Sequence, residues 1–456
     1  MGDIKELLEC RSQYLILLLW LLCLGVSCNF ASAQEGDGNG DVRLRDPNYS
    51  LEIVADGLAD PTGMAFIGSN DILVLEKGKG TVQRIIDGQK QDEPLLDVNV
   101  NSEDERGLLG VAIAKNDSKV NPYVFLYYTE AEGDDEGDPL GNRLYRYELI
   151  DNKLVNPKLL LDLPSLPGPA HNGGVVAVGP DNNVYVAVGD MIPTSYGQTQ
   201  YQSAAQNYEN GKNPDGRGGI LRVTQDGEVV GNKGILGNNH PLDKYFAYGI
   251  RNSFGIAFDP ITGNLWDTEN GPSFGDEINF VDPGFNSGWA KVLGIWSVNE
   301  TVDAEGNREV IKGHQFTSLS KKSGLADLSV LVDFGGHGNY SDPELTWEKS
   351  IGPTSITFLN SEKFGKEYEN DLFMGNVRGQ VYHFDLVSSR TKLALSGPLS
   401  DKVVQDPNET ESLIFGSEFG IITDIEVGPD GNLYVLSGVR DTEGKVYRVS
   451  PSIGGG

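Results

Sequence analysis

A short hairpin pattern recurs along the chain and limits its possible folds more than any other feature. The clearest copies are Val178–Val186 (VGPDNNVYV) and Val427–Val435 (VGPDGNLYV), in which an apolar strand leads through a Pro-Asp turn into a second apolar strand. This turn chemistry suits a tight reversal, because Pro presets φ and Asn or Gly accepts a positive φ. A unit that repeats in this way predicts a fold assembled from copies of one small sheet.

Weaker copies of the pattern bring the number of units to six. Their starts lie near Gly63, Gly107, Gly173, Ser253, Gly352 and Ile422. Six repeated β-units predict an all-β fold, a six-bladed β-propeller over residues 51–450. Their irregular spacing predicts long inter-blade loops, the largest being an insertion at about 297–341. A β-sandwich would show similar strands, but it would not explain why one hairpin recurs.

The length of the chain agrees with a repeated unit. Its 456 residues exceed the usual size of one domain, and it contains 58 Gly and 22 Pro. Propellers are a common exception to that size, because they grow by adding blades rather than by thickening one core. The abundance of Gly and Pro suits many turns between short strands.

The N-terminus predicts export. Basic residues precede an apolar run, Tyr14–Val26, which is shorter than the roughly 20 residues that span a bilayer. Ala31–Ala33 then supplies small residues typical of a cleavage site. We expect 1–33 to be a signal peptide or an N-terminal anchor, since acidic residues near the start leave an uncleaved anchor open. The protein is then extracellular or located in the periplasm or cell envelope.

The net charge argues against some classes of binding partner, and the cysteine positions argue against disulfide bonds. The chain carries 36 Lys+Arg against 66 Asp+Glu, a net charge of −30, which repels nucleic acid and anionic membranes. All three cysteines lie in or beside the targeting segment, so the predicted mature chain has no disulfide framework. The polar, Gly- and Asp-rich stretch 34–50 is expected to be a flexible linker.

One of the five histidines is a candidate catalytic base. His171 lies in a Gly- and Pro-rich loop directly before an expected inner strand. Such loops of a propeller face the central channel, where ligands bind. An unperturbed imidazole titrates near neutral pH, as a general base requires. A structural histidine is the alternative.

Two further segments combine residues suited to ligands. Trp266–Asn279 joins several carboxylates to a Gly-Pro turn, and oxygen ligands of this kind suit Ca²⁺, although an acidic surface turn is the alternative. The pair Arg251 and Asn252 precedes another expected strand. Arg binds a carboxylate ligand through two parallel hydrogen bonds, but it is also a common surface residue.

Four segments, taken together, resemble the soluble quinoprotein sugar dehydrogenases of the glucose/sorbosone dehydrogenase family. They are Glu105–Gly110, His171–Gly174, Gly249–Gly255 and Glu269–Asn279, followed by the Asn-Ser-Gly-Trp motif at Asn286–Trp289. They occur in the family's order, and the resemblance covers about Leu51 to Val449. It implies a six-bladed propeller that holds pyrroloquinoline quinone (PQQ) and Ca²⁺ at the mouth of its channel.

The resemblance also implies a role for each matched residue. His171 would take the proton from the anomeric hydroxyl of an aldose sugar while a hydride passes to the quinone. Arg251 and Asn252 would contact the cofactor. The backbone carbonyls of Gly271 and Pro272 would bind the Ca²⁺ that polarises the quinone. Asp276 and Glu277 would belong to a nearby structural calcium site.

Three departures from the family pattern concern cations. Val175 replaces an Arg after the His-x-Gly-Gly motif, and Ile421–Thr423 stands where the family has paired arginines. Val377 replaces a Lys, and its neighbours Asn376 and Arg378 are the candidate cofactor contacts there, with Arg378 as a substitute cation. The quinone is a tricarboxylate, and each uncompensated loss of a charge-assisted hydrogen bond costs about 1.5–3 kcal/mol.

Three functions therefore stay open at this stage. The first is an exported PQQ-dependent dehydrogenase that acts on a small-molecule sugar and passes electrons to an external acceptor. The second is a calcium-stabilised propeller that has lost PQQ and binds carbohydrate or a protein partner. The third is a calcium-dependent lactonase, which would need several oxygen ligands to converge in the channel.

Overall fold

The computed structural model divides the chain into two compact units, Met1–Asp37 and Gly38–Gly456. It describes residues 41–114, 121–193, 203–209, 214–295, 298–302, 308–312, 331–438 and 443–452. The expected signal segment 1–33 lies outside these residues. A search of the described residues finds no helix that is both long and apolar enough to cross a membrane.

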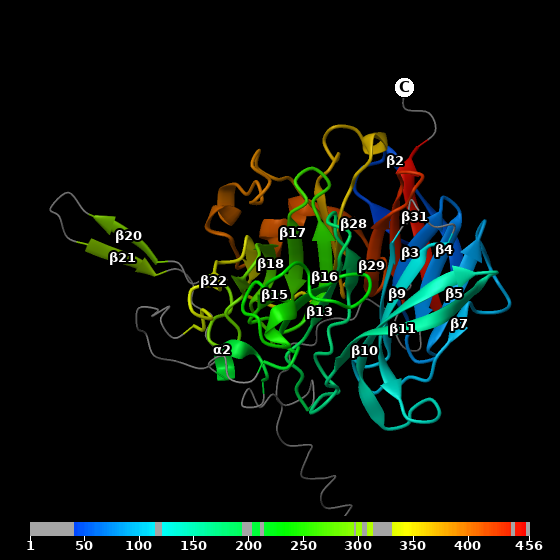
Figure 1. The fold of residues 1–456 in the computed structure, drawn as a ribbon. Helices are drawn as coiled ribbons and strands as arrows, with labels where there is room; N and C mark the ends of the chain where they lie inside the picture. The colour runs from blue at the N-terminus through cyan, green and yellow to red at the C-terminus, as the bar shows by residue number, and fades with distance from the viewer. Residues whose placement is uncertain are drawn as a thin grey trace, which may run out of the picture. The chain divides into compact units, whose positions relative to one another are not determined.

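The second unit is an all-β propeller built from six sheets of four to six strands (Figure 1). Each sheet has one innermost strand, and these are β3 (Pro61–Gly68), β8 (Leu108–Ala114), β12 (Val176–Val178), β16 (Ser253–Phe258), β24 (Pro353–Phe358) and β29 (Ile422–Val427). Each innermost strand contacts the next one in chain order, and β29 contacts β3. The six strands therefore form a closed ring.

The remaining strands continue each sheet outward from its innermost strand. The first sheet adds β4 (Asp71–Glu76), β5 (Thr81–Ile86), β6 (Gln89–Lys90) and β7 (Leu96–Asp97), and the second adds β9 (Tyr123–Ala131), β10 (Pro139–Ile150) and β11 (Lys153–Leu163). The third adds β13 (Val184–Val188), β14 (Gly219–Val223), β15 (Tyr245–Tyr248), β19 (Phe285–Asn286) and β22 (Asn339–Tyr340).

The last three sheets follow the same plan. The fourth adds β17 (Leu265–Glu269), β18 (Asp276–Val281), β23 (Leu345–Trp347) and β27 (Val403–Val404), and the fifth adds β25 (Leu372–Asn376), β26 (Val381–Phe384), β28 (Ile414–Ser417) and β1 (Arg43–Leu44). The sixth adds β30 (Leu433–Ser437), β31 (Glu443–Pro451) and β2 (Tyr49–Ala59). Outside the six sheets lie the hairpin of β20 (Val298–Val302) and β21 (Arg308–Lys312), the one-turn helix α2 (Gln206–Glu209) and the 3₁₀ helices η2 (Leu242–Lys244), η4 (Glu362–Phe364), η5 (Gly397–Asp401) and η6 (Pro407–Leu413).

The recurring hairpin is what the sequence predicts. Each of the six predicted starts lies within three residues of the beginning of an innermost strand. In the copy at Val178–Val186, β12 and β13 pair antiparallel. Asn182 takes the left-handed conformation in the turn, with φ 62°, and its N–H donates to the carbonyl of Gly179. Asn182 thus takes the positive φ that the turn sequence predicts.

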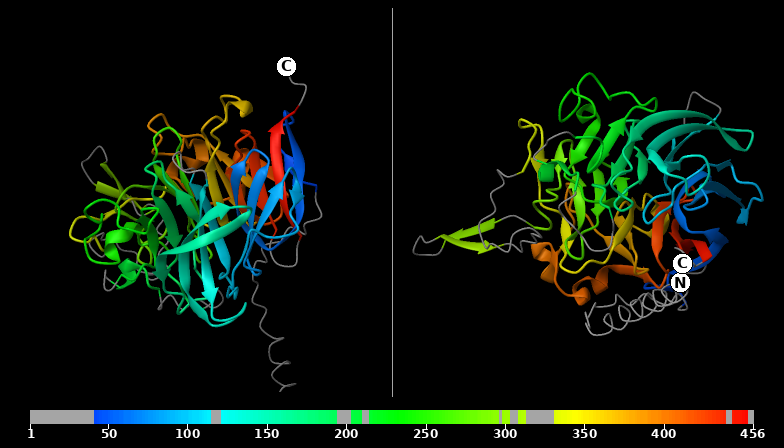
Figure 2. Two further views of the ribbon diagram at one scale, coloured as in Figure 1. Left: turned by 45° about the vertical axis from the view of Figure 1, so that its right-hand side comes forward. Right: turned by 90° about the horizontal axis from the view of Figure 1, so that it is seen from below.

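An early strand of the described chain, β2, pairs with the last strand, β31, in the sixth sheet. β2 pairs with β31 from Tyr49 opposite Pro451 to Ala59 opposite Glu443, and the two lie side by side at the blue and red ends of the colour scale (Figure 2). β1 pairs with β28, so Arg43–Leu44, inside the expected linker 34–50, belongs to a sheet. Much of the expected insertion at 297–341 lies outside the described residues.

Apolar side chains fill the space between neighbouring sheets. One cluster joins Phe125 and Tyr127 of the second sheet to Leu221 and Tyr245 of the third. Another joins Trp266 of the fourth sheet to neighbours in the fifth. The core therefore runs around the ring in layers, and the ends of the innermost strands are left for polar loops.

Asp424 ties three innermost strands together. Its carboxylate on β29 accepts hydrogen bonds from the Met64 N–H on β3, at 2.8 Å, and from the Ser355 hydroxyl on β24, also at 2.8 Å. Burial raises the pKa of Asp424 to about 6, although these donors oppose the rise. The folded chain therefore holds this proton more tightly than the unfolded chain does.

The stability of the fold should depend on this proton. A folded-state pKa of about 6 against an ordinary value of 3.8 means that Asp424 favours folding most below pH 4 and that this contribution falls as pH rises through 6. We expect the difference in unfolding free energy between Asp424→Asn and the wild type to shift in favour of the variant from pH 4 to pH 7. Urea unfolding at several pH values measures it. Asp56→Asn, at an exposed position, is the control, and parallel pH profiles for wild type and Asp424→Asn would contradict the prediction.

Candidate active site

The loop before β12 holds His171 in an unusual backbone conformation. His171 has φ 60°, and Gly173 and Gly174 follow with φ 62° and 116°. A Cβ atom on Gly173 would lie 2.5 Å from the carbonyl oxygen of Ala187, so only glycine fits there. The His-x-Gly-Gly motif thus lets the loop fold closely against the end of β13 and buries the imidazole.

A buried carboxylate orients the imidazole. Nδ1 of His171 lies 2.6 Å from Oδ1 of Asp190, and Oδ2 of Asp190 accepts a 2.6 Å hydrogen bond from the indole N–H of Trp289. Burial alone would raise the pKa of Asp190, but the charge and hydrogen bond of His171, together with Arg251, lower it below its ordinary value. Asp190 is therefore ionised and holds Nδ1, which leaves Nε2 as the atom that can accept a proton.

Glu105 and Asn252 connect this loop to two others. Oε2 of Glu105 accepts from the His171 N–H at 2.7 Å and from the Asn252 side chain at 3.0 Å. Oδ1 of Asn252 in turn accepts from the Gly173 N–H at 3.1 Å. Asn252 therefore positions the histidine loop, which is a different contact from the cofactor contact that the resemblance implies.

Arg251 lies beside these residues and keeps unused hydrogen-bonding capacity. Its Nη1 donates to the carbonyl of Asn270 at 2.7 Å, and its guanidinium lies 5.5 Å from the centre of the Trp289 ring. Among the described residues, its buried Nε–H has no hydrogen-bond partner. Burial lowers the pKa of Arg251, while Asp190 and Glu105 oppose the shift. A buried cation with an unmade hydrogen bond fits an anionic ligand.

These contacts bring the main candidates together. His171 reaches Arg251 through Asp190 and Trp289, and Arg251 reaches the Gly271 segment through the Asn270 carbonyl. The residues come from loops that are far apart in sequence but adjacent in the ring. Convergence of His171, Arg251 and Gly271 at one place is what a shared site requires.

A buried group of acidic side chains lies on the facing strands β17 and β18. Glu269 is directly opposite Glu277, and Asp267 is opposite Asn279. Burial raises the pKa of Asp267 to about 7, that of Glu269 to about 8 and that of Glu277 well above its ordinary value. Among the described residues, Oδ1 of Asp267 and Oδ1 of Asn279 lack hydrogen-bond partners. Oxygen atoms of this kind, short of positive charge, fit a hard cation such as Ca²⁺.

Asp276 has different surroundings from Glu277. Its two oxygens accept from the N–H groups of Gly271, Ile351 and Gly352 and from the Ser350 hydroxyl. Neighbouring residues of a strand face opposite sides, so the structure does not bring Asp276 and Glu277 together. Asp276 anchors the turn that carries Gly271 and Pro272, both of which are partly exposed.

The candidate cofactor contacts in the fifth sheet, Asn376 and Arg378, bond to their own turn and to Ser350. The buried side chain of Asn376 bonds within its own turn, to the N–H groups of Arg378 and Gln380 and to the Gln380 side chain. Arg378 donates to the carbonyl of Ser350, the residue whose hydroxyl binds Asp276. Val377 is 43% exposed and Ile421 is 36% exposed, so apolar side chains do reach the surface where the family pattern has cations.

Several important residues were not singled out as site residues from the sequence. Asp190 lies two residues after the end of β13 and 19 residues from His171, and Trp289 ends the Asn-Ser-Gly-Trp motif much further along the chain. Asp267 and Glu269 belong to the Trp266–Asn279 segment in which the sequence predicts Ca²⁺ ligands, and they stand at alternate positions of a strand whose residues are all buried.

The inner loops of the propeller thus assemble a carboxylate-bound histidine and a buried arginine, and both lie in segments whose motifs resemble the sugar dehydrogenases. The sequence matches the family described as Glucose / Sorbosone dehydrogenase over residues 58–326 and 331–448. The chain belongs to this family.

Curated relatives carry more specific names. The chain is 26% identical over 412 residues to the aldose sugar dehydrogenase YliI of Escherichia coli, covering 88% of this chain and 93% of the relative. It is 26% identical over 450 residues to quinoprotein glucose dehydrogenase B of Acinetobacter calcoaceticus, covering 90% of this chain and 89% of the relative.

Solved structures agree on the fold. The soluble aldose sugar dehydrogenase of Escherichia coli, in its apo form, matches with a TM-score of 0.62 at 22% identity, over 89% of this chain and 100% of that chain. The PQQ-bound aldose sugar dehydrogenase of Streptomyces coelicolor matches with a TM-score of 0.57 at 22% identity, over 88% and 98%. A structure described as the calcium structure of Trichoderma reesei Carbohydrate-Active Enzymes Family AA12 also shares the fold, with a TM-score of 0.56 at 15% identity, over 90% of this chain and 97% of that chain.

The acidic group on β17 and β18 predicts a response to calcium. Ca²⁺ should raise the midpoint of thermal unfolding by roughly 2 °C or more, because it compensates carboxylates that are otherwise buried without enough positive charge. Removal of the ion with a chelator should reverse the effect, and Glu277→Gln should abolish it. Glu132→Gln, in an exposed acidic loop, should keep it. Equal unfolding midpoints with and without Ca²⁺ would rule out the site.

Proposed function

We propose that this protein is an exported quinoprotein dehydrogenase that oxidises aldose sugars at the anomeric carbon, with PQQ and Ca²⁺ as cofactors. The observation that carries the proposal is the buried pair of His171 and Asp190, with Nδ1 on the carboxylate. Family membership and the names of the curated relatives support the substrate class. The proposal includes a blade number of six, which the six sheets support.

His171 acts as the general base. Its Nε2 accepts the proton of the anomeric hydroxyl, while Asp190 keeps the ring in the required tautomer and stabilises the imidazolium that forms. The hydrogen bond from the backbone N–H of His171 to the Glu105 carboxylate keeps the loop in place during this proton transfer. Bound PQQ supplies the acceptor for the hydride that leaves the sugar.

The residues present fit an anionic cofactor in part. Arg251 offers the buried Nε–H that lacks a partner among the described residues, and Arg378 offers a second guanidinium beside the Asp276 anchor. The carbonyls of Gly271 and Pro272 would bind Ca²⁺, on a turn that Asp276 holds in place. Val377 and Ile421 supply no charge. Arg251 and Arg378 would therefore have to bind the quinone carboxylates alone, where the family pattern has more cations.

Substitution of the base should abolish turnover but leave the cofactor bound. His171→Ala should lower the rate of dye reduction with an aldose by about 10²–10⁴, because general-base catalysis contributes that much, and should leave quinone affinity within a few-fold. Asp190→Asn should also lower the rate, since it removes the group that fixes the tautomer. His240→Gln, at an exposed position, is the control. Full activity of His171→Ala would contradict the proposed base.

Exposed Val377 and Ile421 favour a second candidate, a propeller of this family that no longer binds the quinone and instead binds carbohydrate or a partner. Titration of the purified protein with PQQ in the presence of Ca²⁺ separates the two candidates. The dehydrogenase binds at micromolar quinone, and Arg251→Leu weakens that binding at least tenfold, because it removes a charge-assisted contact. Absence of quinone binding would support the second candidate. Calcium-dependent hydrolysis of a lactone by the same purified protein would support the lactonase alternative.

A further inference from the structure

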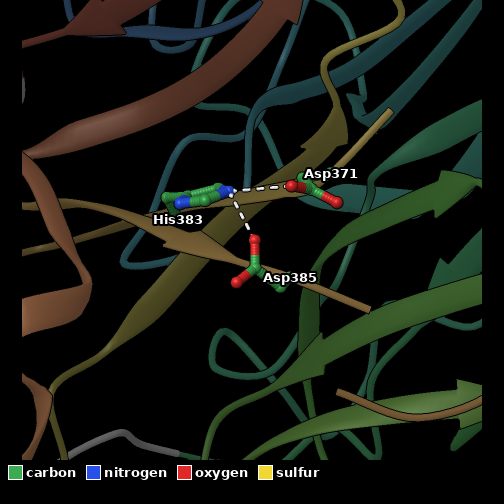
Figure 3. A group of neighbouring side chains, drawn as sticks. All are labelled: Asp371, His383 and Asp385. Carbon is green, nitrogen blue, oxygen red and sulfur yellow. Dashed lines mark hydrogen bonds and ion pairs between the residues drawn. The ribbon is translucent and has the colours of Figure 1, made fainter. Parts of the chain in front are cut away.

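A group of three potential metal ligands lies away from the candidate active site, in the fifth sheet. His383 is on β26, Asp371 directly precedes β25, and Asp385 directly follows β26. Nε2 of His383 is 3.1 Å from Oδ2 of Asp371 and 3.5 Å from Oδ1 of Asp385. Figure 3 shows the ring edge of His383 directed at both carboxylates.

The register of the sheet places all three side chains on one face. Leu372 pairs with Phe384 and Phe373 with His383, so continuing the ladder by one residue sets Asp371 directly opposite Asp385. Side chains alternate between faces along a strand, and Asp385 therefore shares the face of His383. Like charges directly opposite each other destabilise a sheet, so this pair needs a positive charge between its members.

The described residues supply little of that charge. One imidazole N–H can donate to only one acceptor at full strength, and a protonated His383 would still leave the group with a net charge of −1. Among the described residues, no Lys or Arg forms an ion pair with either carboxylate. Arg390 donates to the carbonyl of the neighbouring Asn370, but its ion pair is with Asp259.

The geometry suits a four-coordinate metal ion. Zn²⁺ binds His nitrogen and Asp oxygen at about 2.0–2.1 Å, which sets neighbouring ligand atoms of a tetrahedron about 3.3 Å apart. The two measured separations of 3.1 and 3.5 Å bracket that value, and all three ligand atoms lie within 4.8 Å of one another. A nitrogen ligand favours Zn²⁺ and related transition metals over Ca²⁺, which prefers oxygen alone.

The surroundings of His383 hold the ring in place. Tyr368 contacts it edge-on, with ring centres 4.8 Å apart, and Phe373 packs at 5.1 Å. These aromatic rings limit rotation of the imidazole, so Nε2 stays directed at the carboxylates. On the other side, Asp385 is exposed, with 66% of its side chain accessible, and gives a metal ion a route to the group.

We propose that Asp371, His383 and Asp385 form a binding site for Zn²⁺ or a similar divalent transition metal, with water as the fourth ligand. The ion joins the start of β25 to the end of β26 and compensates the facing carboxylates. This site is separate from the oxygen-rich group on β17 and β18, which lies in a different sheet and suits Ca²⁺.

Zinc titration of the purified protein tests the site. The protein is stripped with a chelator, desalted and titrated with ZnCl₂ in excess CaCl₂, which keeps calcium sites filled. We expect saturable binding at micromolar Zn²⁺, weakened at least tenfold in Asp371→Asn, Asp385→Asn and His383→Gln. Asp385→Asn changes an exposed side chain, so the fold should persist. His240→Gln is the matched control, since His240 is 72% exposed and, among the described residues, pairs with one carboxylate, that of Asp243, at 3.7 Å.

Two outcomes would overturn the proposal. Zinc binding of equal affinity in wild type, Asp385→Asn and His383→Gln would place the ion elsewhere. No saturable binding in the wild type would leave a protonated His383 as the bridge between the carboxylates. Co²⁺ provides a second readout, because a four-coordinate site gives it intense visible absorption that Asp385→Asn should remove.

Discussion

Closure of the ring is the constraint on which the rest of the structure depends. A ring of separate sheets leaves a seam between its first and last sheets. Here the seam is closed because β2, which leads into the first sheet, pairs with β31 in the sixth sheet. Asp424 adds side-chain hydrogen bonds that connect β29 to β3 and to β24. With the seam closed, the innermost strands have fixed neighbours, and the loops at their ends acquire fixed positions relative to one another.

That fixed arrangement explains how a catalytic group can be assembled from separate loops. His171 precedes β12, Arg251 precedes β16, and Trp289 follows β19. Each loop alone is a short irregular segment without a core of its own, and loops are positioned by the scaffold that they connect. Asp190 then accepts hydrogen bonds from His171 and Trp289 and so holds these separate segments together.

The sequence predicts the repeated parts well, because each hairpin is encoded locally by its alternation and its Pro-Asp turn. It also indicates His171 and Arg251, which stand in recognisable loops. It does not indicate the partners of these residues. Asp190 and Glu105 act through contacts that exist only after the ring has closed. Glu105 begins a family-like segment, but that segment does not indicate that its carboxylate binds the His171 loop. Asp276 and Glu277 show the opposite problem, since they are adjacent in sequence but face opposite sides of β18.

The buried carboxylates of the propeller differ in how their charge is compensated, and this difference assigns their roles. Asp190 is fully buried, yet His171 and Arg251 lower its pKa, so it stays ionised without any added ion and can orient a base. Asp267, Glu269 and Glu277 are equally buried, but burial raises their pKa values, and the charge of Arg251 opposes the rise only in part at Glu269. A carboxylate that neighbouring charge keeps ionised suits proton transfer, whereas carboxylates whose burial outweighs that charge attract a proton or a metal ion. Asp371 and Asp385 stand between these cases, because a single imidazole faces two acids and cannot compensate both.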